Sequence, residues 1–121
     1  MKLKYYGTAA AEGIPALFCD CNTCETARKE RGRNIRTRSQ ASVDDRILID
    51  FPADTYHHVL TYGLELHKIR TIIITHDHED HLYENDFCMR GKGFSPMLEK
   101  NPLHIYGSAP AGQKIKKIHL S

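Results

Sequence analysis

Alternating and continuous apolar runs predict strands in the first half of the chain. Polar and apolar positions alternate from Lys2 to Tyr6, which is typical of a half-buried strand. Ala41–Val43 and Arg46–Phe51 are short β-compatible runs, and the Asp44-Asp45 pair between them predicts a hairpin. Asp50 is therefore expected at the end of a strand.

After residue 54 the apolar spacing becomes helical. Asp54 can cap a helix whose apolar residues fall on one face, namely Tyr56, Val59, Leu60 and Leu64. Thr71–Thr75 is a continuous β-branched run, which predicts a strand buried on both faces between helices. Leu103–Tyr106 predicts another strand, and Ser108 with Pro110 predicts the start of a helix that carries Ile115 and Ile118. This succession indicates an α/β fold.

Length and composition fit one ordinary folded domain over residues 1–121. Hydrophobic residues make up 40% of the chain and charged residues 26%, without repeats or a linker, which excludes disordered and coiled-coil classes. The net charge of +2 is too small to indicate a nucleic-acid partner by itself. The start of the chain lacks the apolar run of a signal peptide, and no stretch approaches the roughly 18 apolar residues of a membrane span. We expect a cytoplasmic protein without membrane contact.

The main chemical motif follows the 71–75 run directly and reads His76, His78, Asp80 and His81. His and Asp each occur eight times, so chance yields this pattern roughly 0.002 times in such a chain. His76 and His78, two apart on an extended turn, can point the same way, while Asp80 and His81 face a neighbouring point. Imidazole suits Zn, Mn or Fe and a carboxylate favours a Lewis-acidic ion, so the set predicts a two-metal hydrolytic centre. The alternative is a solvated polar loop.

Two further features accompany this motif. Cys19, Cys21 and Cys24 have the spacing of thiolates around one Zn, although three ligands need a fourth. The alternative is a loop with small buried cysteines, and Cys88 is expected to pack. Asp50, at its strand end, is expected either to orient a metal-bound imidazole or to cap the following turn.

The remaining cationic residues carry weaker signals. Residues 28–38 contain six basic side chains. They could bind a phosphate or a nucleic-acid backbone, but the favoured interpretation is a solvated loop. Aromatic residues are not interleaved with them, so stacking on single-stranded bases is not indicated. His57, His58 and His67 are expected on helix surfaces.

Taken together, these motifs resemble the metallo-β-lactamase superfamily, whose signature is His-x-His-x-Asp-His after a buried strand. The succession from Gly7-Thr8 to Pro15, then Cys19–Cys24, then Leu48-Ile49-Asp50 is similar in order and spacing to the branch containing the phosphoribosyl cyclic phosphodiesterase, the PhnP-like branch. Ribonuclease Z and the pyrroloquinoline-quinone biosynthesis protein B are more distant members. The resemblance implies an αββα sandwich of which this chain supplies about the N-terminal half.

The resemblance also implies roles for individual residues. His76 and His78 would hold one divalent ion and Asp80 and His81 the other, with Zn or Mn as the metal. Asp80 and His81 would take part in catalysis, in which a bridging hydroxide attacks the phosphorus of a small phosphodiester. The three cysteines would hold a structural zinc with a histidine from the distal half.

This sequence departs from the family pattern because the later ligands are missing. The superfamily adds a further His, a bridging Asp and a last His, about seven ligands in all. After His81 only His104 and His119 remain, and His104 is expected to be structural or at the surface. We therefore expect weak or single-metal occupancy and negligible phosphodiesterase activity from 121 residues alone. The alternatives are a non-catalytic metal-binding fragment, which self-associates through uncovered faces, and a hydrolase of another ester, thioester or lactam.

Overall fold

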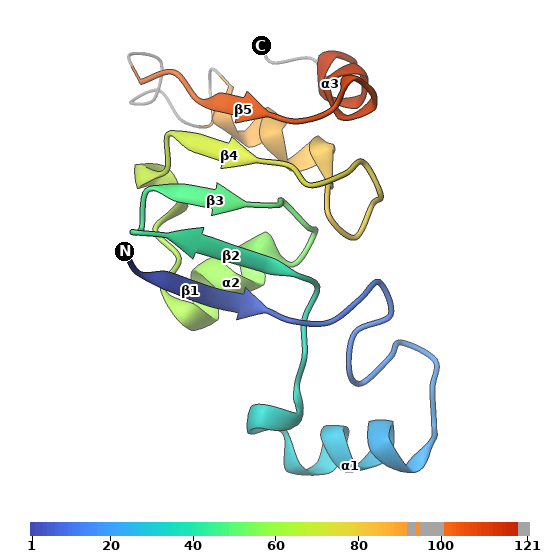
Figure 1. The fold of residues 1–121 in the computed structure, drawn as a ribbon. Helices are drawn as coiled ribbons and strands as arrows, with labels where there is room; N and C mark the ends of the chain where they lie inside the picture. Colours follow the sequence, from blue (N-terminus) through green and yellow to red (C-terminus); the bar gives the residue numbers. More distant parts are fainter. Residues whose placement is uncertain (92–93, 95–100, 119–121) are drawn as a thin grey trace.

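The computed structural model describes residues 1–91, 94 and 101–118. Its five strands form one sheet in the order β1-β2-β3-β4-β5 (Figure 1). The strands are β1 (Leu3–Gly7), β2 (Gln40–Val43), β3 (Ile47–Ile49), β4 (Thr71–Ile73) and β5 (His104–Tyr106). β2 is antiparallel to β1 and to β3, whereas β4 and β5 run parallel to β3. The predicted mixed α/β class is confirmed.

The β2–β3 hairpin forms where the sequence predicts it. Asp44 and Asp45 both have positive φ angles, 53° and 56°. Two successive positive φ values are the geometry of a tight turn whose twist matches that of the flanking strands, and Asp tolerates this conformation better than most residues. The hairpin thereby sets the register that pairs Leu48 with Ser42.

Between β1 and β2 the chain leaves the sheet and carries α1 (Asn22–Glu30) and the 3₁₀ helix η1 (Gly32–Asn34), below the sheet in Figure 1. Two isolated bridges, Ala9 with Arg38 and Ile14 with Arg36, close the base of this excursion. Gly7 is required there because a Cβ on it would lie 2.0 Å from the carbonyl oxygen of Arg38.

The parallel strands bring their carboxyl ends to one edge of the sheet. The β3–β4 connection contains α2 (Thr55–Tyr62) and the 3₁₀ helix η2 (Leu66–Lys68), and the β4–β5 connection contains the 3₁₀ helix η3 (Glu84–Arg90). Asp50 follows β3, and the loop with His76 to His81 follows β4, so the two segments lie at the same edge (Figure 1). The last described helix, α3 (Ala109–Lys116), begins at Ser108, whose hydroxyl accepts from the Ala111 N–H.

One face of the sheet carries the core. Leu48 and Ile72 are paired in register on this face and are almost fully buried. They pack with residues from the connections, including Phe51, Leu64, Ile69, Ile74, Leu82 and Phe87. The rings of Phe51 and Phe87 stack with centroids 4.1 Å apart.

The opposite face of the sheet is partly open. Its central row, in register across all five strands, consists of Tyr5, Ala41, Ile49, Ile73 and Tyr106. Tyr5 and Tyr106 are 66% and 60% exposed, and Ile73 is 41% exposed. The prediction that the 71–75 strand is buried on both faces is therefore wrong for Ile73, because the core packs on one face only.

The predicted helix forms, and of the predicted apolar residues Val59 and Leu64 pack against the core whereas Tyr56 and Leu60 do not. Tyr56 and Leu60 are each 68% exposed, whereas Thr55 and His58 are buried. The expectation that His58 lies on the surface is wrong, because its imidazole hydrogen-bonds with Gln40 of β2 at 2.6 Å. The helix ends at Tyr62, followed by Gly63 with a φ of 69°. None of the described helices has the length and apolar character needed to cross a membrane.

Candidate metal centre

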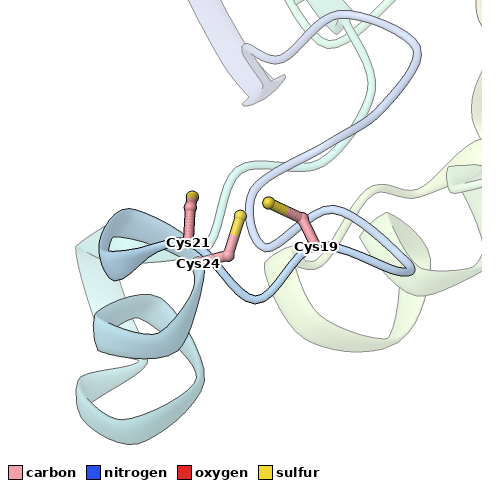
Figure 2. Close-up of side chains that lie close together, drawn as sticks. All are labelled: Cys19, Cys21 and Cys24. Carbon is pink, nitrogen blue, oxygen red and sulfur yellow. The ribbon is translucent and has the colours of Figure 1, made fainter.

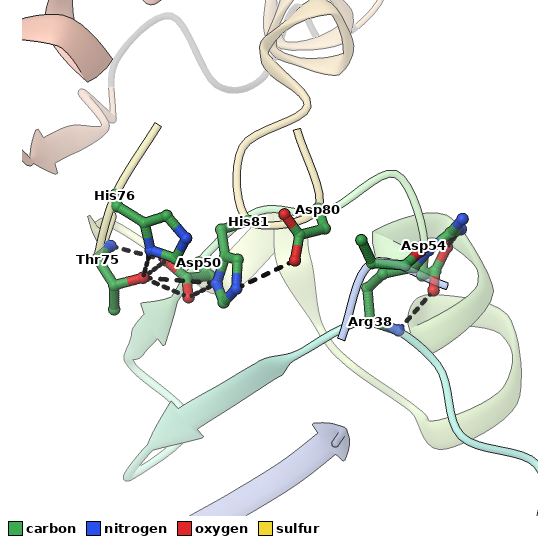
Figure 3. A network of polar contacts seen from close by, with 8 residues as sticks. Arg38, Asp50, Asp54, Thr75, His76, Asp80 and His81 are labelled. Carbon is green, nitrogen blue, oxygen red and sulfur yellow. Dashed lines mark hydrogen bonds and ion pairs between the residues drawn. The ribbon is translucent and has the colours of Figure 1, made fainter. Parts of the chain in front are cut away.

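Three potential metal ligands converge in the loop after β4. The donor atoms of His76, Asp80 and His81 all lie within 4.8 Å of one another. His81 Nε2 and Asp80 Oδ2 are 3.3 Å apart, and both side chains are less than one-fifth exposed. The side chains gather at the end of the sheet in Figure 3. This donor set of two imidazoles and one carboxylate fits a divalent ion such as Zn²⁺.

His78 lies beside this group. Its ring is exposed and contacts the His76 ring edge-on, with centroids 4.7 Å apart and an interplanar angle of 82°. The structure thus brings His76, Asp80 and His81 to one point and places His78 next to it. The division of the ligands between two ions remains a prediction.

Asp50 anchors the centre from the end of β3. Its carboxylate is 2% exposed and accepts from the Thr75 N–H at 2.7 Å and from His81 Nδ1 at 2.6 Å. The Thr75 hydroxyl lies 2.9 Å from both carboxylate oxygens (Figure 3). Of the two roles expected for Asp50, the imidazole contact is the one seen here.

These contacts fix the proton positions on both imidazoles. Since a carboxylate can only accept, His81 Nδ1 carries a proton, and in the neutral ring Nε2 has a free lone pair. The Thr75 hydroxyl donates to Asp50, so it accepts from His76 Nδ1 at 3.0 Å. In the neutral rings both Nε2 atoms are therefore acceptors, which is the state in which imidazole binds a metal.

The backbone of Asp50 is held in an unusual conformation by buried polar groups. Its φ of 68° lies in the left-handed region. The Asp50 N–H donates to the Ile73 carbonyl at 2.8 Å, and the Asp50 carbonyl accepts from Gln40 Nε2 at 3.1 Å. Gln40, 1% exposed, also donates to the Thr55 hydroxyl at 3.1 Å. These bonds position the carboxylate that orients His81.

The same network determines the state of His58. Because both amide hydrogens of Gln40 are donated, its Oε1 accepts from His58 Nδ1. His58 Nε2 then accepts from the Thr37 hydroxyl at 2.7 Å. Burial of the neutral ring lowers the pKa of His58 to about 4.

A polar cavity of about 270 Å³ adjoins the metal centre, lined by Ala11, Arg38, Ala53, Glu79, Asp80 and Tyr83. Arg38 spans its wall: the guanidinium pairs with Asp54 at 2.9 Å and also donates to the Ala11 carbonyl at 2.9 Å (Figure 3). Asp54 therefore binds Arg38 and makes no helix-capping hydrogen bond with its side chain.

On the other side of the centre, α3 supports the metal-site loop. Lys114 donates to the Asp77 carbonyl at 2.6 Å and lies 3.6 Å from the Glu84 carboxylate. His104 is exposed in β5, as expected for a structural or surface residue, while His119 lies outside the described residues.

A second ligand group stands at the start of α1. The sulfur atoms of Cys19, Cys21 and Cys24 lie within 4.8 Å of one another (Figure 2). The pKa of Cys21 is lowered because the Cys24 N–H donates to its sulfur and the neighbouring thiols do so as well. A lowered thiol pKa favours the thiolate that binds zinc. Among the described residues, the group holds three ligands.

The comparisons with known proteins identify the fold. A diphosphatase from the PhnP family superposes with a TM-score of 0.73 at 26% identity, which covers 95% of this chain and 44% of that one. Zn²⁺-bound PqqB from Methylobacterium extorquens superposes with a TM-score of 0.70 at 20% identity, covering 95% of this chain and 40% of that one. Both have the metallo-β-lactamase fold, and this chain therefore has part of that fold.

The sequence comparison agrees. Ribonuclease Z of Latilactobacillus sakei subsp. sakei is 31% identical over 110 residues, 88% of this chain and 30% of that protein. The chain thus spans less than half the length of each of these relatives. No protein-family model matches it. The resemblance to proteins with the metallo-β-lactamase fold, a PhnP-family diphosphatase among them, is confirmed.

Proposed function

We propose that this chain carries the first metal ligands of a metal-dependent phosphodiester hydrolase. The observation that carries the proposal is the convergence of His76, Asp80 and His81, with Asp50 and Thr75 leaving both Nε2 atoms as acceptors. A ribonuclease and a diphosphatase among the similar proteins support phosphoryl chemistry. Two divalent ions, Zn or Mn, would be held with the help of His78.

The bound ion and the protein side chains of the metal centre would have different roles in hydrolysis. A bound divalent ion supplies Lewis acidity toward the phosphodiester and lowers the pKa of a water nucleophile. Asp50 keeps the proton of His81 on Nδ1, and Asp80 adds a carboxylate to the same point. Arg38, which is paired with Asp54, lines the cavity beside Asp80 together with Glu79 and Tyr83.

We further propose that Cys19, Cys21 and Cys24 hold a structural zinc with one ligand from outside the described residues. Its support is the convergence of the three sulfurs. The ion would fix the start of α1 and would not take part in hydrolysis.

Hydrolysis of bis(p-nitrophenyl) phosphate with added Zn or Mn tests the function. We expect the 121-residue chain to be almost inactive, since it supplies four of about seven ligands, and a longer protein containing it to be active. In that longer protein His81→Ala should abolish turnover, whereas the exposed His104→Ala should retain it. Full turnover by the His81 variant would contradict the proposed site. Parent-like turnover by a monomeric 121-residue chain would contradict the expectation that further ligands are needed.

A further inference from the structure

A large groove lies along the edge of β1 that does not pair with β2. It is bounded by β1, the last turns of α2 and the segment around η1, all visible in Figure 1. Its volume is about 850 Å³, against 270 Å³ for the cavity beside Asp80. No residue of the metal centre lines it. This β1-edge groove has the size of a ligand site.

Cationic side chains from the basic run line part of the β1-edge groove. The five arginines of the basic run 28–38 divide into two sets in the structure. Arg28 pairs with Glu25, and Arg38 pairs with Asp54. The other three arginines, Arg31, Arg33 and Arg36, line the groove. In the part of the chain that the structure describes, these three form no ion pair, and no Asp or Glu is among the lining residues. The groove therefore favours an anion.

Aromatic rings line the same groove, although they come from distant parts of the sequence. Tyr5 of β1 is 66% exposed and Tyr62 at the end of α2 is 39% exposed. The Tyr62 ring packs edge-on against His57, with centroids 5.8 Å apart. Lys4 donates to the Tyr62 carbonyl at 3.1 Å, and its ammonium lies 5.2 Å from the centroid of the Tyr6 ring. The exposed ring faces can accept planar groups.

Arginines together with exposed tyrosines match a polymer that has both phosphates and unstacked bases. A duplex would satisfy the arginines only, because its bases are stacked inside. We propose that the β1-edge groove binds single-stranded nucleic acid, with the three arginines on phosphates and Tyr5 and Tyr62 stacked on bases. Binding requires no turnover, so the inference does not depend on the proposed hydrolase.

Fluorescence anisotropy with the 121-residue chain and a labelled single-stranded RNA of roughly 12 nucleotides tests the electrostatic part. If the three arginines each contact one phosphate of the single strand, the logarithm of the association constant should fall linearly with the logarithm of the salt concentration. The slope should be about 2 in magnitude, or about 0.7 for each contact. Arg33→Gln and Arg36→Gln should each weaken binding and lower the slope by about 0.7. Arg46→Gln removes the same charge from the exposed β2–β3 turn and should change neither.

The stacking part is tested at Tyr62. Tyr62→Leu should weaken binding roughly tenfold without changing the salt slope, whereas Tyr62→Phe keeps the ring and should retain affinity. Circular dichroism checks that each variant folds, and gel analysis of the RNA separates binding from cleavage. The proposal would be overturned if Arg46→Gln weakened RNA binding as much as Arg33→Gln does, or if a duplex of the same length bound as tightly as the single strand. Parent-like affinity in Tyr62→Leu would also overturn it.

Discussion

Acidification should destabilise the fold through His58. This ring is fully buried and neutral, and its pKa is lowered to about 4 from 6.5. In the unfolded chain His58 binds a proton below pH 6.5, whereas in the folded chain it does so only below pH 4. The stabilising contribution is therefore complete above pH 6.5, decreases as the pH falls from 6.5 towards 4, and is fully lost below pH 4. At about 1.4 kcal/mol per pKa unit the loss amounts to about 3 kcal/mol.

Urea unfolding between pH 7 and pH 4 measures this effect as the change in the free energy of unfolding. We expect His58→Gln to remove most of the pH dependence in this interval, because the buried titrating group is gone. His57→Gln is the matched control, since His57 is the exposed neighbour on the same helix, and it should keep the parent slope. A His58 variant with the parent slope would refute the reasoning.

Three further predictions concern the buried network, the cysteines and the open face of the sheet. Gln40→Leu should lower the free energy of unfolding by about 3 kcal/mol, because it leaves buried polar partners unsatisfied. In urea titrations the exposed Gln113→Leu should have little effect. Cys24→Ser should remove one zinc per chain in metal analysis, whereas Cys88→Ser should leave the content unchanged. Ile73→Asp should shift the mass in light scattering to the monomer if self-association uses the open face; an unchanged oligomer would refute that interface.

The sequence predicts those parts of the site that depend on residues close together in the chain. His76, Asp80 and His81 lie within six positions, so one turn after a strand suffices to gather their side chains. The cysteines are likewise local. Asp50 was predictable as an orienting residue because a parallel neighbour brings its strand end to the loop after β4, but capping was an equal alternative until the contact with His81 was seen.

Features that depend on long-range packing were not predictable. Helical spacing places apolar residues on one face of α2. Which residues of α2 are buried also depends on β2, because Gln40 of β2 accepts a hydrogen bond from His58. Gln40 carries no local signal, whereas Thr75, directly before the motif, could have been recognised as a hydroxyl next to a histidine. The basic run has no aromatic residues interleaved in the sequence, and the fold brings Tyr62 to it from the end of α2.

Cobalt(II) titration of the metal-free chain tests the central claim most directly, because the optical spectrum of Co²⁺ distinguishes thiolate ligands from nitrogen and oxygen ligands. We expect both kinds of site in the parent chain. The His76→Ala/His81→Ala double variant should lose the nitrogen and oxygen class and keep the thiolate class, while Cys24→Ser should do the reverse. Retention of the nitrogen and oxygen class in the double variant would contradict the assignment of the metal centre to the loop after β4.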